Sequence, residues 1–342
     1  MSSHRATSYD AIIRLNERLR ELDAALLRLQ GLHCHFAIRN AWGFRSGVLR
    51  ALDGVSMHVG QGEILGVVGE SGCGKSTLGK TIAGINTLSG GSIHFEGQEI
   101  GNLKPSESKA LRRKLQYCYQ DPGASLDPHW KIGSALEEPL IVHTRMSRGE
   151  RRERIQETLR AVGLPERHLD LYPHEVSGGQ QRRIGLARVL MLRPSLIILD
   201  EPTSGLDVSV QATVLNLLLD LRARFALSYM FISHDLSVVR LFSQRIAVMY
   251  LGRVVEIGAT EEIFADPKHP YTRSLLAAVP QIGGRRFIET LVLIGEPPSP
   301  GQLPSGCRFR TRCPRAEARC AAEEPALAAL ADGRQVACHF AS

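Results

Sequence analysis

The chain has 342 residues, of which 43% are hydrophobic and 23% charged, so its composition is that of a globular protein and excludes a mainly disordered or collagen-like chain. Lysine and arginine outnumber aspartate and glutamate by 42 to 35, a balance that could favour nucleic acid or an anionic lipid surface as a partner. The densest basic run, Arg148–Arg154, however, interleaves glutamate with arginine as a solvated helix face does, and we favour that interpretation. The longest apolar runs, such as Ile246–Leu251, are far shorter than the roughly 20 residues that cross a membrane, and the start shows no secretory signal. We expect a chain that neither spans a membrane nor is secreted.

The predicted elements divide the chain into three parts. Residues 1–24 place Ile12, Leu15, Leu19 and Leu22 on one helical stripe, which predicts an N-terminal helical extension. Residues 25–265 alternate short strand-like and helix-like segments, the pattern of an α/β domain with a largely parallel sheet, and a charge-rich helical subdomain interrupts it at about 122–185. Residues 266–342 are rich in proline and predict an irregular C-terminal appendage.

A glycine-rich segment, GESGCGKST, follows the apolar run Ile64–Val68 and precedes a helix-like stretch. It matches the pattern G-x-x-x-x-G-K-[ST], whose backbone N–H groups and following helix N-terminus bind phosphate. We expect Lys75 to reach the β- and γ-phosphates and Ser76 to bind magnesium, and we assign no chemistry to Cys73, which fills a variable position. The predicted phosphate-binding residues are Gly69, Glu70, Ser71, Gly72, Cys73, Gly74, Lys75, Ser76 and Thr77.

Two acidic residues end another buried-type strand, in LIILDEP at 196–202. Ligands of open α/β sheets bind at the carboxyl ends of strands, so Asp200 is placed to hold magnesium. Glu201 is placed to orient and deprotonate an attacking water. Taken alone, the pair is also consistent with a solvated turn.

Three smaller signals accompany these motifs. Ser177, Gly178, Gly179 and Gln180 read as the N-cap and first turn of a helix whose exposed N–H groups could approach a phosphate; alone, a plain N-cap with a flexible turn is favoured. Gln120 ends a strand-like run and offers an amide oxygen to magnesium or water. His234 ends a further buried-type strand, at the edge where it would touch a γ-phosphate.

The order of these motifs, GESGCGKST, YQDP, VSGGQ, LIILDEP, SGLD and SHD, resembles the Walker A, Q-loop, signature, Walker B, D-loop and H-loop of ABC-transporter ATPases. The resemblance covers about residues 26–265 and implies a P-loop NTPase core that binds ATP and Mg²⁺. QDPGASLDP, HPYTRSLLAAVP and the ending GCRFRTRCPRAEARC…CHF further resemble the ATP-binding subunits of oligopeptide/dipeptide importers, a class that includes nickel systems.

The resemblance also implies residue roles. Glu201 would be the general base and His234 would contact the γ-phosphate, while Ser177, Gly178, Gly179 and Gln180 would bind the ATP of the opposite subunit. Asp207 would bridge the dimer, and Gln120 would sense nucleotide near the permease contact. Phe36 fits best as the aromatic residue that stacks on adenine, with Trp42 and Phe44 as alternatives.

Such subunits lie peripherally on the cytoplasmic face of the inner membrane. They bind two permease subunits and pair with a second homologous ATPase, so a heterodimer is expected and a homodimer is the alternative; a separate protein captures the substrate. Peptides are the default substrate, with nickel chelates and glycoside conjugates left open. The competing function is a soluble ABC ATPase that acts on nucleic acid, but a single uninterrupted cassette argues against it, and we expect no nucleic-acid partner.

Four of the seven cysteines, Cys307, Cys313, Cys320 and Cys338, crowd the last 36 residues. Without a secretory signal, such a cluster indicates a metal site before a disulfide framework, although no C-x-x-C pair is present. The tail resembles that of importer ATPases to which an iron–sulfur cluster has been assigned, and four thiolates match a 4Fe–4S cluster. Zinc and four plain thiols are the alternatives.

Overall fold

The computed structural model describes residues 25–39, 42–101, 103, 105–120, 122–278 and 295–341. The helical extension expected over residues 1–24 lies outside this described part.

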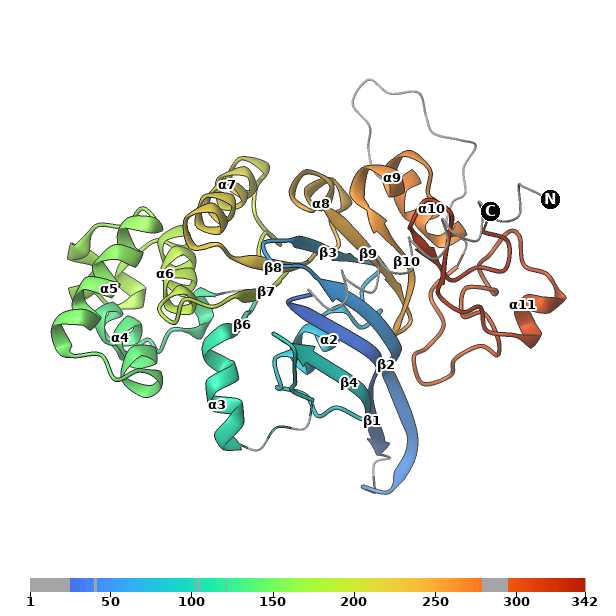
Figure 1. Ribbon diagram of the computed structural model, residues 1–342, viewed down its shortest axis with the longest axis horizontal. Coiled ribbons are helices and arrows are strands. Elements are labelled where there is room, and N and C mark those ends of the chain that lie inside the picture. The colour runs from blue at the N-terminus through green and yellow to red at the C-terminus, as the bar shows by residue number, and fades with distance from the viewer. Residues whose placement is uncertain are drawn as a thin grey trace, which may run out of the picture.

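An eight-stranded mixed sheet forms the centre of the molecule (Figure 1). Its strands, in spatial order, are β11 (Ala328–Ala329), β12 (Gln335–Val336), β10 (Arg253–Ala259), β9 (Arg245–Tyr250), β3 (Ile64–Val68), β8 (Ser228–Ile232), β7 (Leu196–Asp200) and β6 (Leu115–Cys118). The strands from β9 to β6 are parallel, whereas β10, β12 and β11 add antiparallel pairs at one edge. Every residue of β3, β7 and β8 is buried, as expected of strands covered on both faces.

A second, antiparallel sheet lies against one face of the first, with helix α2 (Lys75–Ile82) between the two (Figure 1). Its order is β2 (Arg45–Val59), β1 (Leu27–Arg39), β4 (Gly90–Phe95) and β5 (Gln98–Glu99). Apolar side chains of both sheets and of α2 share one core, in which Leu52, Leu65 and Leu78 are fully buried. This packing places the loop before α2 between the two sheets.

Between β6 and β7 the chain forms a group of helices at one end of the molecule (Figure 1). They are α4 (Ile132–His143), α5 (Arg148–Ala161) and α6 (Gly178–Leu190), with short 3₁₀ turns η1 (Gly123–Ser125), η2 (Glu166–Asp170) and η3 (Pro173–Glu175); α3 (Pro105–Lys114) precedes them. Their apolar faces join the core that also contains Ile197 and Leu199 of β7. Three further helices, α7 (Val208–Phe225), α8 (Leu236–Phe242) and α9 (Thr260–Ala265), precede the tail.

The C-terminal tail lies at the opposite end (Figure 1). After α10 (Pro270–Ala277), the described part resumes at residue 295 and is mostly irregular, with one short helix, α11 (Ala318–Ala322). Strand β12 pairs with Glu256 and Ile257 of β10, so the tail extends the central sheet. The predicted α/β fold with a helical insert and a cysteine-containing appendage is confirmed. Each helix in the described residues is too short or too polar to cross a bilayer.

Candidate active site

The phosphate-binding loop predicted from GESGCGKST connects β3 to α2. Gly69 has a φ of 150° and Gly74 a φ of 106°. A Cβ added to Gly69 would lie 2.2 Å from the Met249 carbonyl oxygen, and one added to Gly74 would lie 2.5 Å from the Ala51 carbonyl oxygen. Both positions therefore require glycine, because a side chain would strain the backbone and collide with the neighbouring main chain. Ser71 and Gly72 are exposed at the rim of the loop.

Lys75 lies inside this loop. Its side chain is buried, and Nζ donates hydrogen bonds to the carbonyl oxygens of Gly69 at 2.7 Å and Glu70 at 3.0 Å. Cys73 packs 3.9 Å from the same ammonium, and burial raises the pKa of its thiol. The loop thus encloses one fixed positive charge, as required of a group that binds the phosphates of a nucleotide.

The two predicted magnesium ligands of the Walker motifs lie together. Ser76 Oγ donates a hydrogen bond to Asp200 Oδ1 at 2.9 Å, and the Tyr117 hydroxyl of β6 donates to the other carboxylate oxygen. Burial, followed by the bond to Asp200, raises the pKa of Tyr117, which keeps it a neutral donor. A hydroxyl and a carboxylate oxygen are hard ligands that suit Mg²⁺. No sequence pattern pointed to Tyr117, which meets Asp200 only because β6 pairs with β7.

Glu201 and His234 also meet, at the carboxyl ends of β7 and β8. Glu201 Oε1 lies 3.1 Å from His234 Nδ1, and the Glu201 N–H donates to the Ile232 carbonyl oxygen at 2.9 Å. Glu201 has a φ of 50°, a left-handed conformation that is costly for a residue with a Cβ. The fold therefore holds this carboxylate in a strained position beside an exposed imidazole.

Gln120, the third predicted magnesium ligand, is hydrogen-bonded to Ser204, whereas Ser76 and Asp200 are hydrogen-bonded to each other. It lies at the end of β6, where its amide donates to Ser204 Oγ at 3.3 Å, in the segment that follows Walker B. This contact links Gln120 to the D-loop side of the site.

The signature residues have the predicted helix N-cap. Ser177 Oγ accepts a hydrogen bond from the Gln180 N–H at 3.3 Å, and Gln180 Oε1 accepts from the Ser177 N–H at 2.9 Å, which completes a capping box. Gly178 and Gly179 are exposed, and an added Cβ on either would meet no atom of the described residues within 4 Å. They border a pocket of about 400 Å³ shared with Leu206 and Val210, which no described Walker A residue lines. Within this chain the signature and the phosphate-binding loop are separate.

The other predicted residues lie at accessible positions. Asp207 precedes α7 and is exposed, and its side chain makes no capping hydrogen bond. Phe36 of β1 is opposite Leu49 of β2 and is 40% exposed, while Trp42 and Phe44 are 84% and 73% exposed. The choice among these three aromatic residues for adenine stays a prediction.

The four tail cysteines line one small, largely enclosed apolar cavity, together with Phe309 and His269. All four are unpaired thiols, and burial raises the pKa of Cys307 to about 11. Among the described residues, no three of these sulfur atoms lie within 4.8 Å of one another.

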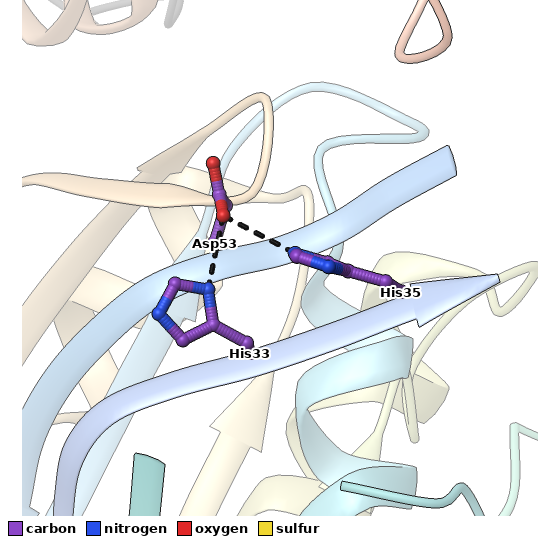
Figure 2. A group of neighbouring side chains, drawn as sticks. All are labelled: His33, His35 and Asp53. Carbon is purple, nitrogen blue, oxygen red and sulfur yellow. Dashed lines mark hydrogen bonds and ion pairs between the residues drawn. The ribbon is translucent and has the colours of Figure 1, made fainter. Parts of the chain in front are cut away.

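A second polar group joins the strands of the antiparallel sheet to the tail. Figure 2 shows His33 and His35 of β1 pointing at one Asp53 oxygen, with Nδ1 of His33 at 2.9 Å and Nε2 of His35 at 3.2 Å. The other oxygen pairs with Arg308 of the tail, and Arg253 lies 3.7 Å away. Burial alone would raise the pKa of Asp53. Its partners Arg308, His33 and His35 instead lower this pKa to about 2, and Arg308 has the largest effect among them. The three ligand-type atoms lie close enough for a metal ion, but the surrounding guanidinium groups already balance the carboxylate, so we interpret the group as an ion-paired junction.

Two family models match this chain. The family model described as ABC transporter matches residues 52–204, and the model described as oligopeptide/dipeptide transporter, C-terminal region, matches residues 255–320. The dipeptide transport ATP-binding protein DppF of Haemophilus influenzae is 47% identical over 92% of this chain and 96% of that protein. The oligopeptide transport ATP-binding protein AppF of Bacillus subtilis is 46% identical over 93% of this chain and 98% of that protein.

Solved structures share the fold. A dimeric ATP-binding cassette in a post-hydrolysis state, bound to ADP and phosphate, has a TM-score of 0.61 and 29% identity over 68% of this chain and 98% of its own. The protein cbiO1 of Clostridium perfringens, part of an ABC transporter complex, also has a TM-score of 0.61 and 29% identity, over 71% of this chain and 92% of its own. The chain therefore belongs to the ABC-transporter ATPases, with the C-terminal region of the oligopeptide/dipeptide transporter family.

Proposed function

We propose that this chain is the ATP-hydrolysing subunit of an importer that moves peptides through a membrane permease. One observation carries the proposal: Lys75, the Ser76–Asp200 pair and the Glu201–His234 pair lie at one edge of the central sheet, in a chain whose tail matches the peptide-transporter family. Peptides are the substrates in the names of its relatives.

In this mechanism Lys75 binds the β- and γ-phosphates, and Ser76 and Asp200 hold Mg²⁺, which neutralises phosphate charge when bound. Glu201 accepts a proton from the attacking water. His234, whose Nδ1 lies 3.1 Å from Glu201 Oε1, orients that carboxylate and contacts the γ-phosphate. The strain at Glu201 fits this role, since strained residues with fixed side chains concentrate at functional sites.

The active form is a dimer in which the signature of one subunit covers the ATP of the other. The exposed Gly178 and Gly179 support this, because no described residue of the chain lies close enough to require glycine there. A related cassette has been solved as a dimer bound to ADP and phosphate. Asp207 lies at the D-loop where it would bridge the subunits, and a second homologous ATPase is the expected partner.

The subunit works peripherally on the cytoplasmic face of the inner membrane, against two permease subunits that receive peptide from a separate binding protein. Gln120 and the helices α4 and α5 would transmit closure of the dimer to the permease. Purification from membranes tests this: we expect co-purification with permease subunits, and recovery with DNA or ribosomes alone would contradict it.

Ser177→Arg tests the dimer. The variant should suppress ATP turnover while the isolated chain binds nucleotide as tightly as the parental protein, since Ser177 serves the opposite site. An equal loss of nucleotide affinity in the monomer would place Ser177 in its own chain's site and refute the exchange of signatures.

The tail cysteines are proposed to hold a 4Fe–4S cluster, with zinc as the alternative. The set fits a four-thiolate centre because all four thiols line one apolar cavity and are unpaired.

Such a centre would stabilise a tail with little regular structure. Iron, sulfide and zinc analysis of anaerobically purified protein tests the proposal: we expect iron and sulfide in equal amounts, about four of each per chain. Stoichiometric zinc, or four titratable thiols with no metal, would refute the cluster and leave the ATPase unaffected.

A further inference from the structure

A short turn of the tail, Cys307–Cys313, lies against the phosphate-binding loop. Its Phe309 is buried between two tyrosines, with ring centres 5.3 Å from Tyr250 of β9 and 5.4 Å from Tyr271 of α10. Main-chain hydrogen bonds from Arg310 to Cys307 at 3.1 Å and from Arg312 to Phe309 at 3.0 Å tighten the turn. These contacts fix the position of the Arg312 backbone, from which its side chain extends.

Arg312 reaches Glu70, the second residue of the Walker A motif. Two parallel hydrogen bonds of 2.7 and 3.0 Å join the guanidinium to the carboxylate, and the Arg312 side chain is only 4% exposed. The bond to Glu70 raises the pKa of Arg312, so the guanidinium stays charged. The Tyr271 hydroxyl accepts a further hydrogen bond from the Glu70 N–H at 2.9 Å. Glu70 is therefore held at both its side chain and its main chain.

The position of Glu70 affects the loop in two ways. Its carbonyl oxygen accepts a hydrogen bond from Lys75 Nζ. Gly69 and Gly72 in the same loop give the backbone conformational freedom that must be lost when a ligand binds. A partner that fixes Glu70 beforehand reduces this loss. In addition, a carboxylate beside a polyphosphate repels it unless a cation neutralises the carboxylate, and Arg312 is that cation.

We propose that Arg312 is a positioning residue for ATP binding: through Glu70 it holds the Walker A loop in its binding conformation and neutralises a carboxylate that would otherwise repel the phosphates. The inference rests on the proposed binding of ATP phosphates by this loop and adds a residue from the tail to that site.

The test is rescue by a second substitution. Arg312→Gln leaves the Glu70 charge unpaired, so we expect the Kd of the isolated chain for a fluorescent ATP analogue with Mg²⁺ to rise about tenfold, as one lost charge-assisted contact implies. Glu70→Gln combined with Arg312→Gln removes both charges and should recover most of that loss. Arg310→Gln is the matched control, because Arg310 belongs to the same turn but contacts Ser305, and its Kd should match the parental value. In the assembled transporter, Arg312→Gln should raise KM for ATP and leave kcat at saturating ATP nearly unchanged.

A Kd for Arg312→Gln equal to the parental one would overturn the proposal. So would a double variant as weak as Arg312→Gln, because the loss of affinity would then not come from the unpaired Glu70 charge. If Arg312→Gln does not fold, Arg312→Lys, which keeps the charge and loses one of the two parallel bonds, should give an intermediate Kd, and an unchanged Kd would again overturn it. A parental protein that fails to bind the analogue would refute the site assignment itself, which separates that failure from failure of the positioning role.

Discussion

Glu201→Gln separates ATP binding from hydrolysis most directly. Glutamine has the volume of glutamate, and the backbone of residue 201 is held by its own N–H bond to Ile232 at 2.9 Å, so the strained conformation and the fold should persist. What the variant loses is the proton acceptor that lies 3.1 Å from His234 Nδ1. A positioned general base contributes about 10²–10⁴ in rate, which corresponds to about 3–5 kcal/mol of barrier height.

We therefore expect phosphate release by the assembled transporter to fall by about 10²–10⁴ while the affinity for ATP is kept. The stalled variant should accumulate as an ATP-bound dimer, measurable by size-exclusion chromatography with light scattering. Glu261→Gln is a suitable control, because Glu261 is an exposed acidic residue that pairs with Arg240 away from the site. Hydrolysis at the parental rate would show that Glu201 is not the base, and loss of ATP affinity would show that it contributes to ground-state binding.

Two further predictions concern the phosphate-binding loop and the tail. Lys75→Ala should abolish tight ATP binding in a fluorescence titration, because it removes the buried ammonium that the loop encloses; a Kd within threefold of the parental value would refute this role. Burial lowers the pKa of His269 to about 3, whereas the unfolded side chain titrates near 6.5, so the contribution of neutral His269 to stability is complete above about pH 6.5 and is lost as pH falls towards 3. His269 Nδ1 caps α10 by accepting a hydrogen bond from the Tyr271 N–H at 3.0 Å. His269→Asn keeps a cap acceptor but does not titrate. Between pH 6.5 and 5 the unfolding free energy, measured in urea, should therefore fall by about 2 kcal/mol more in the parental protein than in this variant. Equal losses for parental protein and variant would contradict this account.

The geometry of the glycine-rich loop and of the Ser177 N-cap was predictable because each depends on residues close together in sequence. GESGCGKST encodes its own turn, since the positions with positive φ, such as Gly69 and Gly74, are glycines that no other residue could replace. The Ser177 N-cap likewise depends on a partner three residues later, within the same helical turn. Patterns of this kind specify a conformation without the rest of the fold.

The residues that sequence reasoning missed act across the fold. Tyr117 reaches Asp200 from the neighbouring strand, and Arg312 reaches Glu70 from 242 positions away along the chain. No periodicity or spacing encodes such a meeting, because it depends on strand order and on how the tail packs. Tyr271 is an intermediate case: the HPYT segment was recognised as typical of a family, but its contact with Glu70 was not predicted. Strand β12 also escaped prediction, because two residues are too few to show alternation.

The signature glycines give a last prediction, in which stability and activity change in opposite directions. Gly179 lies in the first turn of α6 and is exposed, and in the part of the chain that the structure describes no atom lies within 4 Å of a Cβ added there. Alanine there should stabilise the isolated chain by about 0.5 kcal/mol, since glycine in a helix is less favourable than alanine and no contact opposes the methyl group. In the dimer the same methyl group would intrude where the signature N–H groups approach the opposite ATP, so turnover should fall at least tenfold. Urea unfolding of the monomer and phosphate release by the assembled transporter measure the two effects on one variant. A gain in stability with unchanged turnover would mean that no nucleotide approaches this turn, and the exchange of signatures between subunits would then be wrong.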